Sequence, residues 1–241
     1  MDMNLFQKIS DLKSVIEKRR PLNEGELREL RKWYRVSMTF HSNALEGSTL
    51  TESETKLLIE EGITVGGKTV RELKEALNHG TLVDELFAVA SGKEAMTESL
   101  INRWHSILLK DIDPENAGRY RRVSISVTGS QEIFPSSSEV PKLMAGFYDW
   151  FHQSSSPEPV TLAANIHWKF VKIHPFIDGN GRMARLILNL ILMKAGFPPT
   201  IIPFVRRSEY LDALRKTPQA FETFIAETVV ENMKDYCRML E

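Results

Sequence analysis

Residues 174–185 read His-Pro-Phe-Ile-Asp-Gly-Asn-Gly-Arg-Met-Ala-Arg, and an apolar run over residues 183–193 continues from them. That run is far shorter than the roughly 20 residues that a membrane-spanning helix needs. It also contains Arg185 and Asn189, which favour the interior of a protein over lipid. The sequence therefore predicts a buried helix over 180–195 with a glycine-rich turn directly before it.

The junction of turn and helix has the chemistry of a phosphate site. The backbone N–H groups of Gly179, Asn180 and Gly181 come at the positive end of the predicted helix, where they would face an anion. Arg182 and Arg185 are three residues apart and so lie on one helical face. Two fixed cations beside such N–H groups suit a polyphosphate better than a single phosphate.

Two further side chains in the same stretch complete a set for phosphoryl chemistry. Asp178 offers a hard oxygen ligand, and one carboxylate together with substrate phosphates is the usual way a protein holds Mg²⁺. His174 has an unperturbed pKa near ~6.5, so it is mostly neutral at pH 7 and able to take a proton from a hydroxyl. The pattern predicts in-line attack on a phosphorus. His167 lies seven residues before His174, but this spacing lacks the close ligand pair of a zinc site and favours helix packing.

The rest of the chain is predominantly helical in its periodicity. Asn23 with Glu26, and Thr51 with Glu54, have the spacing of capping boxes at helix starts. Apolar spacing predicts further helices over residues 5–16, 23–45, 51–61, 69–90, 97–110, 138–152, 159–173, 207–216 and 219–239.

One segment departs from the helical pattern. Apolar and polar residues alternate over 123–127, a turn sequence follows at 128–130, and residues 131–134 would return antiparallel as a small hairpin. No internal repeat or long linker interrupts the chain. The predicted fold is mainly α, one helical domain with one small β-hairpin.

Composition excludes several classes of function. Lys and Arg total 31 against 32 Asp and Glu, so the net charge of -1 gives no general attraction to nucleic acid or to an anionic membrane. The single cysteine, Cys237, excludes an internal disulfide framework, and no basic-then-apolar leader is present, so we expect a cytoplasmic protein. The phosphate-loop motif GxxxxGK[ST] of P-loop NTPases does not occur.

The stretch 174–185 resembles the signature of the Fic (Fido) family, HPFx[DE]GNGRxxR, at every defined position. Ala-Gly-Arg-Tyr-Arg at 117–121 is similar to the segment that precedes the family's target-docking flap, and Gly-Phe-Pro-Pro at 196–199 is similar to the exit of its motif helix. The resemblance implies a helical bundle with a β-hairpin flap. It assigns residues 98–241 to the Fic catalytic core and residues 1–97 to an N-terminal helical region.

The resemblance also implies an activity, because Fic enzymes are mostly protein AMP-transferases that use ATP and Mg²⁺. It implies that His174 is the catalytic base and that Asp178 holds Mg²⁺. Tyr210 would line the adenine base. The residues that it assigns to the phosphates are Gly179, Asn180, Gly181, Arg182 and Arg185.

An upstream segment is similar to the inhibitory motif of the same family, [ST]xxxE[GN]. Residues 42–47 read Ser-Asn-Ala-Leu-Glu-Gly, which puts Ser42 and Glu46 at the defined positions. Its location before the predicted core is similar to that of the inhibitory motif in the class of Fic proteins with an N-terminal inhibitory helix. The resemblance implies that Glu46 pairs with Arg185 in the resting protein and keeps the γ-phosphate of ATP out.

The predicted hairpin has two interpretations. It either connects two blocks of helices or pairs its edge with an extended segment of a target protein and presents a Ser, Thr or Tyr hydroxyl to His174. The family uses its flap in the second way. The side chains assigned to target docking are Val127, Ile133 and Phe134.

Other functions remain open at this stage. The same site would serve deadenylylation with Glu46 positioning a water, or transfer of phosphate or phosphocholine, although the phosphate-transferring relatives depart from the Gly-Asn-Gly-Arg loop. A non-catalytic nucleotide sensor and a DNA-binding regulator are alternatives of another class, and the neutral net charge argues against the latter. A homodimer is an expectation from the family alone.

Overall fold

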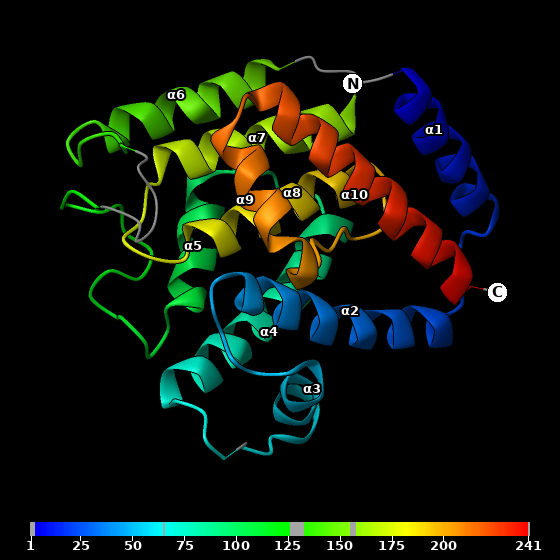
Figure 1. Ribbon diagram of the computed structural model, residues 1–241, viewed down its shortest axis with the longest axis horizontal. Coiled ribbons are helices and arrows are strands. Elements are labelled where there is room, and N and C mark those ends of the chain that lie inside the picture. Colours follow the sequence, from blue (N-terminus) through cyan, green and yellow to red (C-terminus); the bar gives the residue numbers. More distant parts are fainter. Residues whose placement is uncertain (1–2, 65, 126–132, 155–157, 241) are drawn as a thin grey trace.

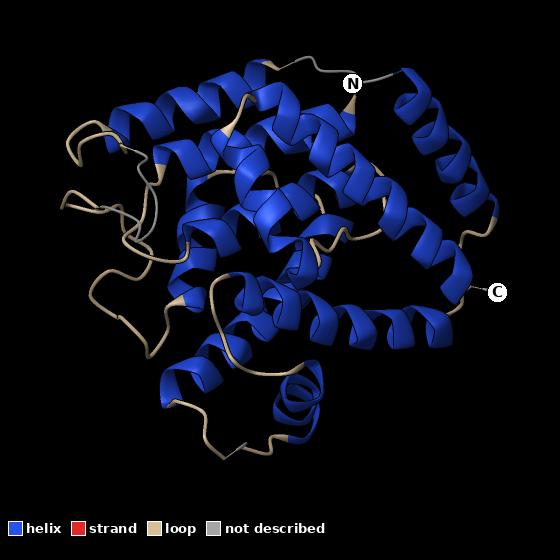
Figure 2. Ribbon diagram, viewed as in Figure 1, coloured by secondary structure: helices blue, strands red, loops and turns tan. Residues whose placement is uncertain are grey.

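The computed structural model describes residues 3–64, 66–125, 133–154 and 158–240, and their regular structure is helical throughout (Figures 1 and 2). All the helices predicted from apolar spacing are present, with bounds shifted by a few residues at most. In chain order they are α1 (Met3–Lys18), α2 (Glu24–Leu45), α3 (Glu52–Glu61), α4 (Val70–Ser91), α5 (Glu98–Leu108), α6 (Val140–Gln153), α7 (Pro159–Ile173), α8 (Asn180–Lys194), the short 3-10 helix η1 (Phe204–Arg206), α9 (Arg207–Arg215) and α10 (Pro218–Met239).

Capping boxes start α2, α3 and α4. In α2 the Asn23 side chain accepts a hydrogen bond from the Glu26 N–H, and the Glu26 carboxylate accepts one from the Asn23 N–H, each at 2.9 Å. Thr51 and Thr69 begin α3 and α4 in the same way. Each box satisfies two N–H groups that a helix start would otherwise leave without partners, so these three starts are fixed locally by the sequence.

Helix α8 forms the centre of the molecule. Its residues from 183 to 192 are all buried, and α7 packs along its length while α4, α5 and α2 contact its other sides. Figure 1 shows α6 and α7 above α8 and α2 below it. A helix that is surrounded on all sides is expected to be apolar around its whole circumference, which explains the run at 183–193.

A buried amide attaches the end of α8 to the returning chain. Asn189 Nδ2 donates to the Arg185 and Thr200 carbonyl oxygens at 2.9 Å each, and its Oδ1 accepts from the Thr200 N–H at 2.6 Å. These bonds satisfy polar groups of an irregular segment that crosses the protein interior.

Helices α1, α2 and α4 share one hydrophobic core with the rest of the chain, whereas Leu58 of α3 belongs to a separate small cluster. Helix α1 packs against α10 through Ile9 and Ile16, which are both buried. The cluster of buried apolar side chains runs continuously from Ile9 to Tyr236 and crosses the predicted domain boundary at residue 97. Because one core spans both predicted parts, the packing does not mark where one domain ends, and the boundary after residue 97 stays a prediction.

The predicted hairpin is only partly covered by the described residues. Residues 126–132, Val127 among them, lie outside them. The described flanks, 123–125 and 133–135, are irregular and form no strand. The mainly helical class is thus confirmed, whereas the strands expected at these flanks are absent from the described part of the chain. The buried side chain of Arg121 donates hydrogen bonds to the carbonyl oxygens of Val123 and Pro135. These oxygens are therefore not available for pairing between strands.

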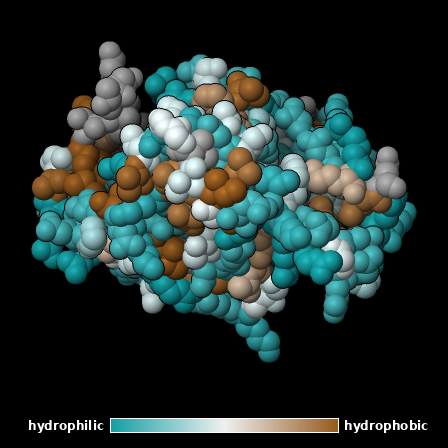
Figure 3. All heavy atoms as spheres, turned by 90° about the horizontal axis from the view of Figure 1, so that it is seen from below, coloured by the Kyte–Doolittle hydropathy of each residue, from teal (hydrophilic) through white to brown (hydrophobic). Residues whose placement is uncertain are grey.

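The face seen from below in Figure 3 is largely hydrophilic, with apolar clusters scattered among polar side chains. No helix in the described ranges combines the length and the apolar character needed to cross a lipid bilayer.

Gly118 lies where the chain leaves α5 for the irregular segment, and it has a φ of +71°. A Cβ there would lie 2.8 Å from the Asn102 carbonyl oxygen and even closer to Ser106 Oγ. We expect Gly118→Ala to lower the free energy of unfolding by about 2–4 kcal/mol, because backbone strain adds to a steric clash.

Gly146→Ala in α6 is the matched control for urea unfolding, since a Cβ at Gly146 meets nothing within 4 Å. The control should raise the free energy of unfolding by about 0.5–1 kcal/mol. Equal effects of the two substitutions would contradict this account of Gly118.

Candidate active site

The chain turns sharply at His174, where α7 ends and the loop to α8 begins. His174 has a left-handed backbone with φ 51° and ψ 60°, and its N–H donates to the Phe170 carbonyl oxygen at 3.0 Å. Its Nδ1 lies 3.1 Å from the Val171 carbonyl oxygen. A carbonyl only accepts, so Nδ1 carries the proton and Nε2 carries the lone pair. The ring packs against Phe134, with ring centroids 4.3 Å apart.

Arg121 holds the backbone of this turn from the side. Its Nε donates to the His174 carbonyl oxygen at 2.8 Å, and the Arg121 N–H donates to the Pro175 carbonyl oxygen at 2.9 Å. The other guanidinium nitrogens donate to the Val123 oxygen at 3.0 Å and to the Pro135 oxygen at 2.6 Å. One buried cation thereby fixes both the histidine turn and the two ends of the flap segment.

The interior of the loop is closed by Asn180. Its Oδ1 accepts from the Phe176 N–H at 2.9 Å, and its Nδ2 donates to the Phe176 carbonyl oxygen at 2.8 Å. The side chain is buried, and both ends of its amide are used within the loop. The Asn180 side chain therefore shapes the turn, and the phosphate contact that the resemblance implies for this residue stays a prediction.

His105 supports the same loop from α5. Its Nδ1 accepts from the Gly118 N–H at 2.9 Å, so the proton is on Nε2, which donates to the Asp178 carbonyl oxygen at 3.1 Å. The ring stacks on Phe176 with centroids 3.6 Å apart and an interplanar angle of 6°. Burial lowers the pKa of His105 to about 4, even though the hydrogen bond to Asp178 raises it.

The aspartate and the first arginine of the motif face helix α4. Asp178 Oδ2 is 2.5 Å from Arg71 Nη2, and its Oδ1 accepts from the Gly179 N–H at 2.6 Å. Arg182 lies between Asp178 Oδ1 and Glu75 Oε1, at 3.4 Å from each. The charged groups of this part of the motif are therefore neutralised by an oppositely charged pair on α4.

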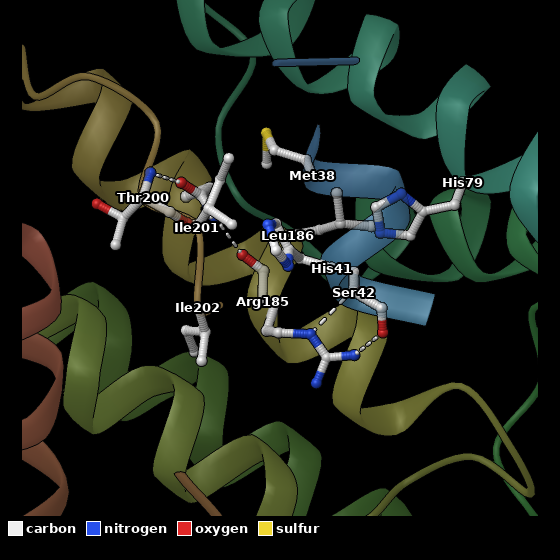
Figure 4. A pocket seen from close by; sticks show the side chains of 10 residues that line it. Met38, His41, Ser42, His79, Arg185, Leu186, Thr200, Ile201 and Ile202 are labelled. Atoms are coloured by element: carbon white, nitrogen blue, oxygen red, sulfur yellow. Dashed lines mark hydrogen bonds between the residues drawn. The ribbon is translucent and has the colours of Figure 1, made fainter. Parts of the chain in front are cut away.

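Arg185 takes different partners, on the C-terminal end of α2. Its Nε donates to Ser42 Oγ at 3.0 Å, and Nη2 donates to the Ser42 carbonyl oxygen at 2.9 Å (Figure 4). Nη2 also donates to Glu46 Oε1 at 2.7 Å. The predicted contact of Glu46 with Arg185 is thus present in the structure. Ser42 completes it by fixing the guanidinium plane.

The carboxylate of Glu46 lies at the start of α8. It is so close to Gly181 that a Cβ on this residue would collide with Oε1. An anion at this position is favoured by the positive end of the helix. Although burial raises the pKa of Glu46, the charges of Arg185 and Arg182 lower it below its ordinary value. The group is therefore ionised near neutral pH and occupies the place where the sequence predicted phosphate.

Tyr210 borders Arg185 from α9. Arg185 Nη1 donates to the Tyr210 hydroxyl at 3.3 Å, and that hydroxyl lies 3.2 Å from His167 Nε2. Burial lowers the pKa of His167 well below its ordinary value, so its neutral ring accepts the tyrosine proton. The sequence correctly placed His167 on a packed helix face. Tyr210 is buried against the arginine, beside the site assigned to the adenine end.

A small cavity of about 20 Å³ lies behind Arg185, between α2, α4 and α8 (Figure 4). This is room for about one water molecule. His79 borders it, with Nδ1 3.1 Å from Thr39 Oγ1 on α2 and its Nε2 without a protein partner. The cavity is too small for a substrate.

Of the residues assigned to target docking, Phe134 lies against the His174 ring, and Ile133 is 95% exposed. Four residues that sequence reasoning missed hold the site together: Arg71, Glu75, His105 and Arg121. Arg71 and Glu75 have the spacing of a helical ion pair, which is common on exposed helices and so gave no signal. His105 and Arg121 act through the backbone, and their sequence neighbours do not reveal this.

The carboxylate of Asp178 can supply one of the oxygen ligands that Mg²⁺ needs, in a site that also contains two arginines. The described residues contain no cluster of three or more His, Cys, Asp or Glu side chains that would hold a metal by themselves. A cation at Asp178 would take its other ligands from phosphate oxygens and water, as Mg²⁺ does in nucleotide sites. The donor chemistry therefore fits a cation that arrives with the nucleotide.

The fold and the site together define a Fic-type helical domain. The Fic/DOC family model matches residues 95–192. A Fic domain-containing signaling protein from Bacteroides thetaiotaomicron has a structure with a TM-score of 0.89 at 28% identity, covering 97% of each chain. Fic-1 from C. elegans is 30% identical with a TM-score of 0.85, over 98% of this chain and 71% of that one. The chain belongs to the Fic/DOC family.

Curated relatives extend the match beyond the motif. Protein adenylyltransferase Fic of Drosophila grimshawi is 34% identical over 246 residues, which cover 97% of this chain and 50% of that protein. The chain thus spans about half the length of the curated relatives it matches.

The low pKa of His105 makes protein stability depend on pH. Unfolding releases the ring to a pKa near ~6.5, so the stabilisation is complete above that pH and is lost as the pH falls towards about 4. Below pH ~6 the free energy of unfolding of the wild type should fall more steeply with falling pH than that of His105→Gln. The two slopes should differ by about 1 kcal/mol per pH unit.

Urea titrations at several pH values would measure this difference. His152→Gln, at an exposed position of α6, is the control and should keep the wild-type slope. Parallel stability curves for His105→Gln and the wild type would exclude a neutral buried His105 as the cause.

Proposed function

We propose that this protein transfers AMP from ATP to a Ser, Thr or Tyr hydroxyl of a target protein. The observation that carries the proposal is the arrangement of three groups around one turn: the lone pair of His174 Nε2, the N-terminus of α8, and the guanidinium of Arg185. Together they provide a base and a polyphosphate site. The curated relatives named protein adenylyltransferase support the same reaction.

The proposed roles follow the chemistry of each group. The target hydroxyl oxygen attacks the α-phosphorus of ATP while its proton moves to His174 Nε2. The bond from the α-phosphorus to the oxygen of the leaving pyrophosphate breaks, and the adenylylated hydroxyl and pyrophosphate are the products. The N–H groups of Gly179 and Gly181 and the arginines Arg182 and Arg185 would hold the phosphates.

Asp178 is the residue that would hold Mg²⁺. When bound, the cation would neutralise charge that develops on the leaving phosphates. Asn180 supports this site indirectly, because its amide keeps the loop from Phe176 to Gly181 in the shape that aims the backbone N–H groups outwards. Tyr210 would then contribute to the adenine side of the pocket through its contact with Arg185.

Autoinhibition by Glu46 is the second part of the proposal. The ionised carboxylate occupies both the Arg185 guanidinium and the start of α8, which are the groups proposed for the outer phosphates. Its side chain is 42% exposed whereas that of Arg185 is 7% exposed, so the glutamate is the partner that can leave. This supports assignment to the class with an N-terminal inhibitory helix.

The flap would bring the target to the base. Ile133 is fully available to a partner, and Phe134 touches the His174 ring, so a target segment held by these side chains would pass the histidine. Val127, which lies outside the described residues, stays part of the proposed target-docking segment. A homodimer is a further proposal from the family, and a cytoplasmic location is one from the single cysteine.

Deadenylylation is the second candidate, and the position of Glu46 favours it. The carboxylate is charged, partly exposed and at the phosphate site, where it could orient a water towards an AMP-modified hydroxyl. Transfer from another phosphate-containing donor and nucleotide sensing without catalysis would use the same groups. Labelling with α-labelled ATP distinguishes AMP transfer from both of them.

Glu46→Gly should raise AMP transfer at least ~10-fold, which corresponds to about 1.4 kcal/mol of transition-state stabilisation. The substitution removes the anion that competes with the phosphates while leaving Arg185 in place. Label incorporated from α-labelled ATP with Mg²⁺, into the protein itself and into a cell lysate, is the measurement.

The double variant Glu46→Gly with His174→Ala is the control and should lose the label. Equal labelling by the wild type and Glu46→Gly would overturn autoinhibition. Absence of label from every variant that still binds ATP would overturn AMP transfer and favour another donor or a sensor.

A further inference from the structure

Four charged side chains form a closed ring at the mouth of the site. Arg71 Nη2 is 2.5 Å from Asp178 Oδ2, and Arg71 Nε is 3.1 Å from Glu75 Oε1. Arg182 closes the ring with 3.4 Å contacts to Glu75 and to Asp178. Helix α4 supplies one pair and the motif supplies the other, each with four-residue spacing. Every charge therefore lies between two of opposite sign.

The two halves of the ring differ in their exposure to water. The Arg182 and Glu75 side chains are 2% and 14% exposed, so their contact is fixed inside the protein. The Arg71 and Asp178 side chains are 58% and 42% exposed. An exposed ion pair contributes little stability and exchanges readily, whereas a buried one is costly to break. The ring thus has a permanent side and an exchangeable side.

Both oxygens of Asp178 already accept from cationic or N–H donors while the ring is closed. Oδ2 is engaged by the Arg71 guanidinium, and Oδ1 is engaged by the Gly179 N–H and by Arg182. Of these donors only Arg71 is a long, exposed side chain from outside the motif. A divalent cation at Oδ2 and a guanidinium at the same oxygen would repel each other, so the two compete for this position.

We propose that Arg71 is a displaceable counter-ion of Asp178, a positioning residue that occupies the carboxylate in the resting protein and gives way when the cation arrives with the nucleotide. Its contact with Glu75 keeps it beside the site after displacement, ready to return when the cation leaves. Competition from Arg71 thereby raises the concentration of divalent cation at which the site is filled. This inference rests on the proposed role of Asp178 as the residue that holds the cation.

The test measures cation binding rather than turnover. Mn²⁺ is titrated into the Glu46→Gly protein in the presence of α,β-methylene-ATP, whose α–β bond cannot be cleaved by transfer, and free Mn²⁺ is followed by its paramagnetic resonance signal. Removing the competing guanidinium with Arg71→Gln should tighten Mn²⁺ binding by about two- to fivefold, the range expected for an exposed ion pair. Arg71→Lys keeps the positive charge beside Asp178, so its Mn²⁺ affinity should stay close to that of the protein with Arg71.

Arg103→Gln is the matched control. Arg103 on α5 pairs with Glu85 of α4 and with Glu94, and its loss changes the net charge equally. Glu85 lies about 20 Å along α4 from Arg71. It should leave Mn²⁺ affinity unchanged. The gain from Arg71→Gln should also shrink in high salt, because the pair is exposed to solvent.

Asp178→Asn separates failure of this inference from failure of the proposed cation site. If Asp178→Asn weakens Mn²⁺ binding but Arg71→Gln leaves it unchanged or weakens it, Arg71 does not compete with the cation and the inference is overturned while the site stands. If Asp178→Asn has no effect, the cation is held elsewhere and both are overturned.

Discussion

A guanidinium inside a protein must be paired, and the position of Arg185 imposes this requirement on the whole structure. Arg185 comes from α8, the helix that is buried on all sides, so its charge cannot reach bulk water. Burial lowers its pKa, yet the carboxylate of Glu46 more than offsets this and keeps the group charged. Helix α2 has to pack where it delivers Ser42 and Glu46 to that guanidinium.

The same requirement explains the order of the remaining parts. Helix α9 brings the Tyr210 hydroxyl to the third nitrogen of Arg185, and α4 neutralises Arg182 one turn earlier. An apolar helix that carries two cations thus determines which helices surround its first two turns. A phosphate chain would be an equivalent solution to the same electrostatic problem, since it would also place negative charge beside these cations.

The helices could be predicted from sequence because their signals are local. Capping boxes at Asn23 and Thr51 and the uniformly apolar run at 183–193 each specify one element without reference to the rest of the chain. The site residues of the motif were predictable because twelve adjacent positions carry them. His105 and Arg121 were not, since each binds backbone groups that are far away in sequence, and their partners exist only after folding. The loop bonds of the Asn180 side chain could not be predicted either, because they depend on the folded shape of the turn.

Arg121 joins the backbone of His174 to the carbonyl groups of Val123 and Pro135. The two ends of the segment between them are anchored to the turn that carries the histidine. Because the anchors are backbone carbonyl groups, the side chains between them can change in sequence while the imidazole keeps its place. A lineage that keeps this arginine can therefore vary one loop independently of the histidine turn.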